Sequence, residues 1–346
     1  MKPAKPLVLI ALLSLFTSLG ILGFQASPPR GDLLGSTRAF LAALTPEQHK
    51  LAVMTYDAPV RTDWHFIPKE SRKGLILREM TEPQREQAHA VLRAALSQIG
   101  YDKAAAIMEV EALLKHLQDA GGGRGPIRDT LRYYWTIFGE PTDSSTWGLS
   151  IEGHHLSLNF VVRGGKIVSV TPMTFGTNPA TIMGEYPVGP AKGTRIVDAE
   201  ERLAYELLAM LGESQRTRAV VSDRPLDEVR NAGRPQPAGA EKQGIPGSAL
   251  NAEQKAKLRS LIASYFSNLP AAVAESRLAE LDSAGLDAVH FGWWGGHEKG
   301  QPHYFRVEGP TVLIELANTQ SDSAGNPANH IHAMLRDPRS DFLLGN

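Results

Sequence analysis

Four of the 11 histidines form two close pairs, and these pairs are the residues best suited to chemistry. His330 and His332 are separated by one residue in "NHIHAMLRDP", which reads as a β-strand, so both rings should project from the same face. Two neutral imidazoles placed in this way can bind one metal ion while another strand supplies a third ligand. The alternative is that these histidines only satisfy buried hydrogen-bonding groups.

The other pair, His154 and His155, lies in "GLSIEGHHLSLNF", residues 148–160, which also alternates like a strand. Alternation places His155 on the more polar face together with Asn159, and His154 on the opposite, more apolar face. We therefore predict that His155 joins the C-terminal pair at a metal site. His154 would be a fourth ligand or would support the site from behind. A bulge at Gly153, which turns both rings to one side, is the alternative.

Two charged residues on neighbouring predicted strands are candidates for catalysis. Glu315 stands between two apolar residues in "TVLIELAN", where a carboxylate is costly to bury unless it has a partner. We predict that Glu315 is a general base or a further metal ligand, with Arg306 acting beside it. The alternative is that Glu315 faces water on a half-exposed strand.

Aromatic and polar residues in "FGWWGGHEKGQPHYFRVEG" form a candidate binding wall. Trp294, His303 and Tyr304 in this stretch, together with Asn159, are predicted to contact a small polar, aromatic or sugar-like ligand. Core packing is the alternative for the aromatic residues. The sequence has none of the common nucleophile, zinc-protease or phosphate-loop motifs, so no alternative chemistry is favoured.

The elements that must position these residues follow from caps and periodicity. Helices are predicted to begin after Thr45, Thr81 and Asp198, because each is a good N-cap with Gln or Glu at the third helical position. The stretch "RTDWHFIP" alternates and is predicted to be a short strand. Residues 223–247 are rich in Pro and Gly and indicate a long surface loop.

Period-two alternation gives a hairpin over residues 146–176, with its turn at Gly164 and Gly165, and a C-terminal meander of antiparallel strands. Helical segments precede strands in each half of the chain, and no fixed-period repeat is visible. The predicted class is therefore α+β, with an antiparallel sheet built from two β blocks, the hairpin and the meander, and covered by helices.

Composition limits the partners and the compartment. The chain has 346 residues, 36 basic against 37 acidic side chains and no cysteine, so nucleic acid is an unlikely partner and disulfides are excluded. Two lysines before an apolar run predict a signal peptide over residues 1–26, with an uncleaved membrane anchor as the alternative. We predict a periplasmic or secreted protein, in contact with a membrane only through this segment, with residues 35–346 as a single domain.

Several long motifs, in the same order, resemble the exported proteins grouped as domain of unknown function 3500: "GHHLSLNF", "FGTNPA", "GQPHYFRVEGPTVLIELANTQ" and "NHIHAMLRDP". The resemblance covers nearly everything after the leader and implies no particular activity. It implies a set of shared positions: His154, His155, Asn159, His303, Tyr304, Arg306, Glu315, Asn318, Asn329, His330, His332 and Arg336.

The resulting functional expectation is a metal-dependent, hydrolase-like enzyme that acts on a small molecule. The metal ligands would be His154, His155, His330 and His332, and imidazole ligands favour zinc or copper as the divalent ion. Copper would indicate oxidation instead of hydrolysis. One alternative is a non-enzymatic periplasmic protein that binds metal or a small ligand, and another is a purely structural role for the histidines.

Overall fold

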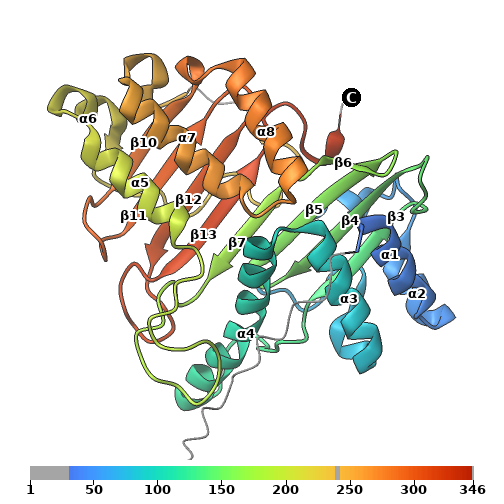
Figure 1. Ribbon diagram of the computed structural model, residues 1–346. Coiled ribbons are helices and arrows are strands. Elements are labelled where there is room, and N and C mark those ends of the chain that lie inside the picture. Colours follow the sequence, from blue (N-terminus) through green and yellow to red (C-terminus); the bar gives the residue numbers. More distant parts are fainter. Residues whose placement is uncertain (1–30, 238–241, 345–346) are drawn as a thin grey trace, which may run out of the picture. The chain divides into compact units, whose positions relative to one another are not determined.

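The computed structural model describes residues 31–237 and 242–344, in which 13 strands form one sheet (Figure 1). Residues from Gly31 onward cluster as one compact unit. The expected α+β class and the mostly antiparallel sheet are confirmed, while the expected leader, residues 1–26, lies outside the described residues. Within those residues, no helix is both long and apolar enough to cross a membrane.

The helices begin where the sequence provides caps. The capping boxes at Thr45 and Thr81 are present, and the third predicted helix starts at Ala199, directly after Asp198. The helices are α1 (Leu33–Ala42), α2 (Pro46–Ala52), α3 (Glu82–Ala95), α4 (Gln98–Ala120), α5 (Ala199–Met210), α6 (Glu213–Ala219), α7 (Ala252–Phe266) and α8 (Ala271–Ala284).

The strands fall into an N-terminal and a C-terminal group. The first group comprises β1 (Val53–Met54), β2 (Leu75–Ile76), β3 (Tyr134–Phe138), β4 (Thr146–Gly153), β5 (Leu156–Arg163), β6 (Lys166–Ser169) and β7 (Met173–Thr177). The second comprises β8 (Val220–Ser222), β9 (Ile245–Pro246), β10 (His290–Gly295), β11 (His303–Glu308), β12 (Leu313–Gln320) and β13 (His330–Arg336). The antiparallel ladders from β10 to β13 confirm the predicted meander.

The sheet has the same arrangement in both halves of the chain. Its order is β1-β3-β4-β5-β7 followed by β13-β12-β11-β10-β8. From the edge to the centre, the strands of each half therefore follow one another in chain order, and β1, β3, β4, β5 and β7 correspond to β8, β10, β11, β12 and β13. Strands β1 and β8 are each parallel to their neighbour, and β2 and β9 each pair with that same neighbour. The two halves meet where β7 pairs with β13.

Local contacts also repeat between the two halves, which indicates an internal duplication. Gln84 in α3 donates to the Ala43 carbonyl and to Gln48 at 2.8 Å each. Gln254 in α7 forms the matching pair of bonds, to the Met210 carbonyl at 2.9 Å and to Gln215 at 2.8 Å. Residues 73–96 and 243–266 therefore occupy equivalent places.

The sheet separates two hydrophobic clusters. The helices lie over one face (Figure 1), where they pack on the main core. The opposite face carries a smaller cluster that includes Trp64, Phe66, Tyr304 and Met334. The stretch "RTDWHFIP" is not the predicted strand, because its backbone joins no ladder there and the alternating Trp64 and Phe66 side chains are instead buried against this second face.

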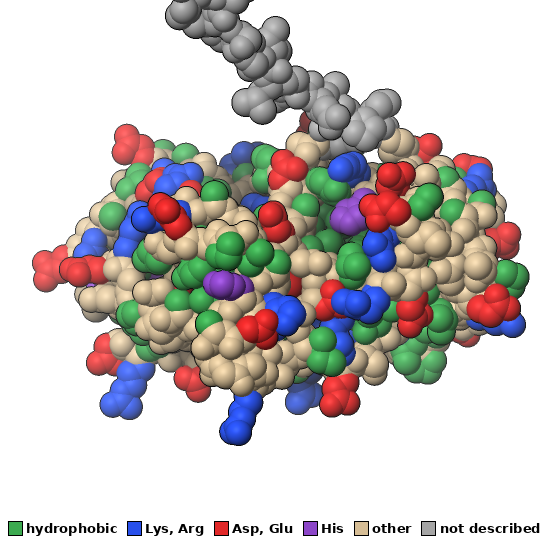
Figure 2. Space-filling view, turned by 90° about the horizontal axis from the view of Figure 1, so that it is seen from below, with side chains coloured by type: hydrophobic (Ala, Val, Ile, Leu, Met, Phe, Trp, Pro, Cys, Tyr) green, Lys and Arg blue, Asp and Glu red, His purple; other side chains and the backbone are tan. Residues whose placement is uncertain are grey.

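Charged side chains of both signs are interspersed over the face shown in Figure 2, without a broad patch of one sign. This agrees with the near balance of 36 basic and 37 acidic residues.

Candidate metal centre

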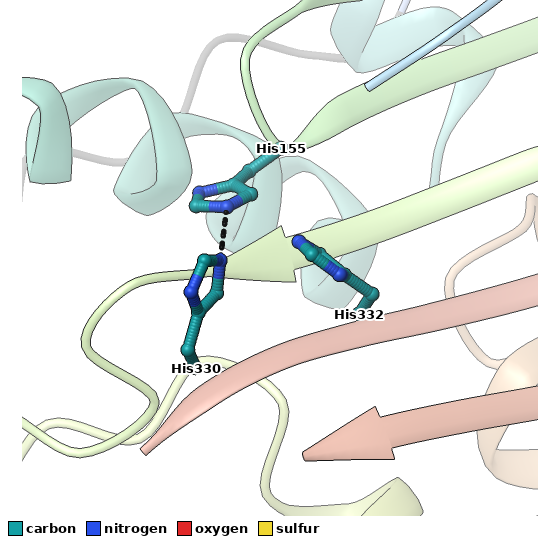
Figure 3. A group of neighbouring side chains, drawn as sticks. All are labelled: His155, His330 and His332. Atoms are coloured by element: carbon teal, nitrogen blue, oxygen red, sulfur yellow. Dashed lines mark hydrogen bonds between the residues drawn. The ribbon is translucent and has the colours of Figure 1, made fainter. Parts of the chain in front are cut away.

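Three of the four paired histidines converge at the junction between the two halves of the sheet (Figure 3). The Nε2 atoms of His155 and His330 are 2.9 Å apart. Ring centroids are 5.2 Å apart for His155 and His332, and 4.8 Å apart for His330 and His332. One ring nitrogen from each histidine lies within 4.8 Å of the other two. The predicted meeting of the two distant histidine pairs is therefore confirmed.

A tight turn brings His155 to this cluster. Residues 148–160 are not one strand, because β4 ends at Gly153, His154 and His155 form the turn, and β5 starts at Leu156. His155 has a φ of 62°, a left-handed conformation that few non-glycine residues adopt. Its backbone N–H donates to the Phe66 carbonyl at 2.7 Å, and its carbonyl accepts from Gly176 at 2.7 Å. These bonds offset the strain of the turn and fix the direction of the ring.

His330 and His332 project from the same face of β13, as their spacing predicts. His332 lies opposite Gly176 of β7 in the ladder. A Cβ atom at Gly176 would lie 2.8 Å from Cδ2 of His332 and 3.2 Å from Cδ2 of His155. Only glycine at this position leaves room for the imidazoles to approach each other.

Side chains around the C-terminal pair hold the rings in place. The Nδ1 atom of His332 lies 2.7 Å from a carboxylate oxygen of Glu228, and the ring of Phe66 packs 4.7 Å from the His332 ring. The backbone N–H of His330 donates to Asn318 at 3.1 Å. Glu228 comes from the segment predicted to be a loop, so nothing in the local sequence indicated this contact.

His154 occupies a separate environment next to the cluster. Its ring stacks on that of His155 with centroids 3.7 Å apart, and its Nδ1 atom hydrogen-bonds to Glu111 of α4. Arg128 lies 3.0 Å from the same nitrogen. Both rings of the dipeptide thus lie on one side, which the turn produces instead of the bulge considered for Gly153. Glu111 was not identified from sequence, because it occupies an ordinary position in a helical pattern.

Burial controls the charge of these imidazoles. Desolvation, followed by the nearby histidines, holds the pKa of His155 well below its ordinary value and lowers the pKa of His330 to about 3. Desolvation also lowers the pKa of His154, against the opposing effect of Glu111. The rings of His155, His330 and His154 are therefore neutral near pH 7, which is the form that binds a metal.

The donor set fits a transition-metal ion. Three nitrogens bound tetrahedrally at about 2.0–2.1 Å from zinc stand roughly 3.3–3.4 Å apart. The 2.9 Å contact between His155 and His330 is shorter by a few tenths of an ångström, so small ring movements would admit the ion. Copper also accepts imidazole ligands. In zinc sites of this kind, three protein ligands leave a fourth position open.

The predicted catalytic pair lies elsewhere on the same face of the sheet. Glu315 is opposite Met334 in the ladder, two pairs further along than His332, and it accepts from Tyr304 and Arg230. Burial raises the pKa of the Glu315 carboxyl. The Nη2 atom of Arg306 lies 2.8 Å from a carboxylate oxygen of Glu308. Glu315, Tyr304 and Arg230 form their own polar cluster, and the ring of Trp294 lies against that of Tyr304 with centroids 5.1 Å apart.

Two other predicted ligand-binding residues do not contact the histidine cluster. His303 projects from the helix-covered face, where its ring lies 3.3 Å from Glu201 and 3.0 Å from the Tyr205 hydroxyl. Asn159 accepts from Ser150 at 3.0 Å and donates to the Pro172 carbonyl at 3.0 Å. Both side chains are engaged in local hydrogen bonds within the protein.

The fold and the site define an α+β protein with a buried group of imidazoles at the junction of two duplicated halves. The chain belongs to the family described as Protein of unknown function (DUF3500), whose model matches residues 29–343. Neither the curated proteins nor the solved structures contain a significant match to it.

Proposed function

We propose that this protein binds one divalent transition-metal ion, zinc or copper, through His155, His330 and His332. The observation that carries the proposal is the convergence of these three rings from two remote segments. Mutually facing imidazoles make few hydrogen bonds with one another, and a metal ion would bind a nitrogen of each ring at once. The contact between His332 and Glu228 resembles the carboxylate–histidine pairs that orient metal ligands.

We further propose that the ion serves a hydrolase-like reaction on a small molecule. With three protein ligands, an ion at this site would keep an open position and would supply Lewis acidity for activating water. Glu111 and His154 are acid–base groups next to the cluster, with the two rings of the histidine dipeptide stacked. Glu315 is a poorer general base than the sequence suggests, because Tyr304 and Arg230 already occupy its carboxylate.

A second candidate is a non-enzymatic metal-binding protein, and the burial of His155 and His332 favours it. The neighbouring cavity, which is lined by His154 and Glu111 and by none of the three ligands, has a volume of about 10 Å³, which is room for one water molecule. His155 and His332 are 2% and 5% exposed. A bulky substrate would reach an ion here only after side chains had moved.

Metal content tests the binding proposal most directly. Untagged protein should contain about one equivalent of metal by elemental analysis, and the His330→Ala/His332→Ala variant should contain none. His155→Asn should also lose the ion, because Asn tolerates the left-handed turn but provides no imidazole. His297→Ala, at an exposed histidine outside the cluster, is the matched control and should retain full loading. Equal metal in all four proteins, or in none, would overturn the proposal.

Activity distinguishes the two candidates. A hydrolase should turn over small ester or amide probes only when loaded with metal, and Glu111→Gln should reduce kcat while the metal content stays at one equivalent. A binding protein should hold the ion without turnover. In that case, Glu111→Gln should leave the metal content at one equivalent and no turnover should be detected with either protein. Only the stability should change, and by a small amount.

Export is a separate proposal that rests on residues 1–26. Mass measurement of the mature protein from a periplasmic extract should show a chain that begins near residue 27. A full-length chain in the membrane fraction would favour the anchor instead.

A further inference from the structure

A large groove shares none of its lining residues with the histidine cluster. Its volume is about 940 Å³, within the range of small-molecule sites. Strand β6, the segment that joins it to β7, the first half of α8 and the segment after β13 form most of its walls. Leu33 and Ala94 from the N-terminal helices complete the lining.

The lining combines an apolar surface with an excess of positive charge. Leu33, Ala94, Ile167, Val168, Val170, Ala272, Val273 and Leu343 supply the apolar surface. Val168 is 44% exposed, an unusually open position for a valine in a strand. Three basic residues, Lys166, Arg277 and Arg339, face two acidic ones, Glu280 and Asp337.

One of the basic residues retains an unused donor. Arg277 is bound by Glu280 and Asp337, at 3.0 Å each, and by the Thr311 carbonyl at 2.7 Å. Its Nε atom is nevertheless buried and has no hydrogen-bond partner among the described residues. A buried donor of this kind is normally paired, and Arg277 is one of the residues that line the groove.

We propose that the groove binds a small amphipathic acid, a molecule with an apolar chain and one carboxylate. The valine-rich floor removes the chain from water, and the carboxylate accepts from Arg277 near Lys166. Apolar contact supplies most of the affinity, because each buried methylene contributes about 0.8 kcal/mol. The charge excess selects an anionic head group over a cationic one. The proposal is independent of the metal site, since the groove shares no residue with the histidine cluster.

Calorimetric titration of the full protein with decanoate, below its micelle concentration, tests the proposal. We expect one decanoate per chain and at least tenfold weaker binding of decyltrimethylammonium, which has the same chain and the opposite charge. Val168→Asp should weaken decanoate binding at least tenfold, because it places a charge on the apolar floor. Val188→Asp is the matched control, since Val188 is 40% exposed and does not line the groove.

The head-group contact has its own test. Lys166→Gln should weaken decanoate binding about two- to fivefold, the effect of removing an exposed charge, and should leave binding of neutral decanol unchanged. Three results would each overturn the proposal: no decanoate binding, equal binding of the cationic probe, or equal weakening by Val168→Asp and Val188→Asp.

Discussion

Acid should destabilise the metal-free protein through His330. Its pKa is about 3 in the folded protein and 6.5 when the ring is solvated, because burial disfavours the charged form. Between these two pH values the unfolded chain binds one more proton than the folded chain at this site. Stability therefore decreases as the pH falls below 6.5, and this contribution levels off below about pH 3.

The size of the effect follows from the two pKa values. Each pH unit between them is worth about 1.36 kcal/mol, so a decrease from pH 8 to pH 5 removes about 2 kcal/mol of stability through His330 alone. His155, whose pKa is also well below its ordinary value, acts in the same direction. Such a loss is a large fraction of the 5–15 kcal/mol that typically separates folded from unfolded states.

Urea unfolding in the presence of a chelator, at pH 8 and at pH 5, measures this contribution. Carboxylates also titrate near pH 5, so the informative quantity is the stability of His330→Asn relative to the wild type. The free energy of unfolding of the variant, relative to that of the wild type, should be about 2 kcal/mol higher at pH 5 than at pH 8. His297→Asn is the exposed control and should show no such gain. A difference between His330→Asn and the wild type that is the same at both pH values would refute the reasoning.

Three further predictions concern contacts around the site and the duplicated helices. Gly176→Ala should destabilise the protein by about 1–3 kcal/mol, measured by urea unfolding, and should lower metal loading, because its Cβ would contact the ring of His332. Glu228→Gln should reduce metal affinity about tenfold in a competition titration, since it removes the charge that holds that ring. Gln84→Leu and Gln254→Leu should each cost about 1–3 kcal/mol, and the double variant should show the sum, because the two networks are separate.

The sequence predicts those elements well that depend on interactions between residues close together in the chain. Capped helix starts such as those at Thr45 and Thr81 depend on residues within one turn, and the meander depends on alternation and turn residues. The same-face placement of His330 and His332 follows from strand geometry alone. These features needed no information about tertiary contacts.

The features that the sequence does not predict depend on contacts between distant segments. Alternation predicts a strand at His155, because no sequence pattern marks a histidine that adopts a positive φ. The turn at Gly164 and Gly165 is predicted correctly, because glycine is the residue that favours a positive φ. Glu111 and Glu228 reach the histidines from a helix and a loop, and neither spacing nor composition indicates such an approach. The duplication was missed because insertions of different length separate the equivalent elements.

The ladder between β7 and β13 has a consequence for assembly. In the described part of the sheet, the pairing of β7 with β13 joins the two halves. The histidine cluster contains His155 from the first half and His330 and His332 from the second. An ion held by these rings would cross-link segments 175 residues apart. If the halves were produced as separate chains, divided within residues 178–198, their reassociation would be linked to metal concentration.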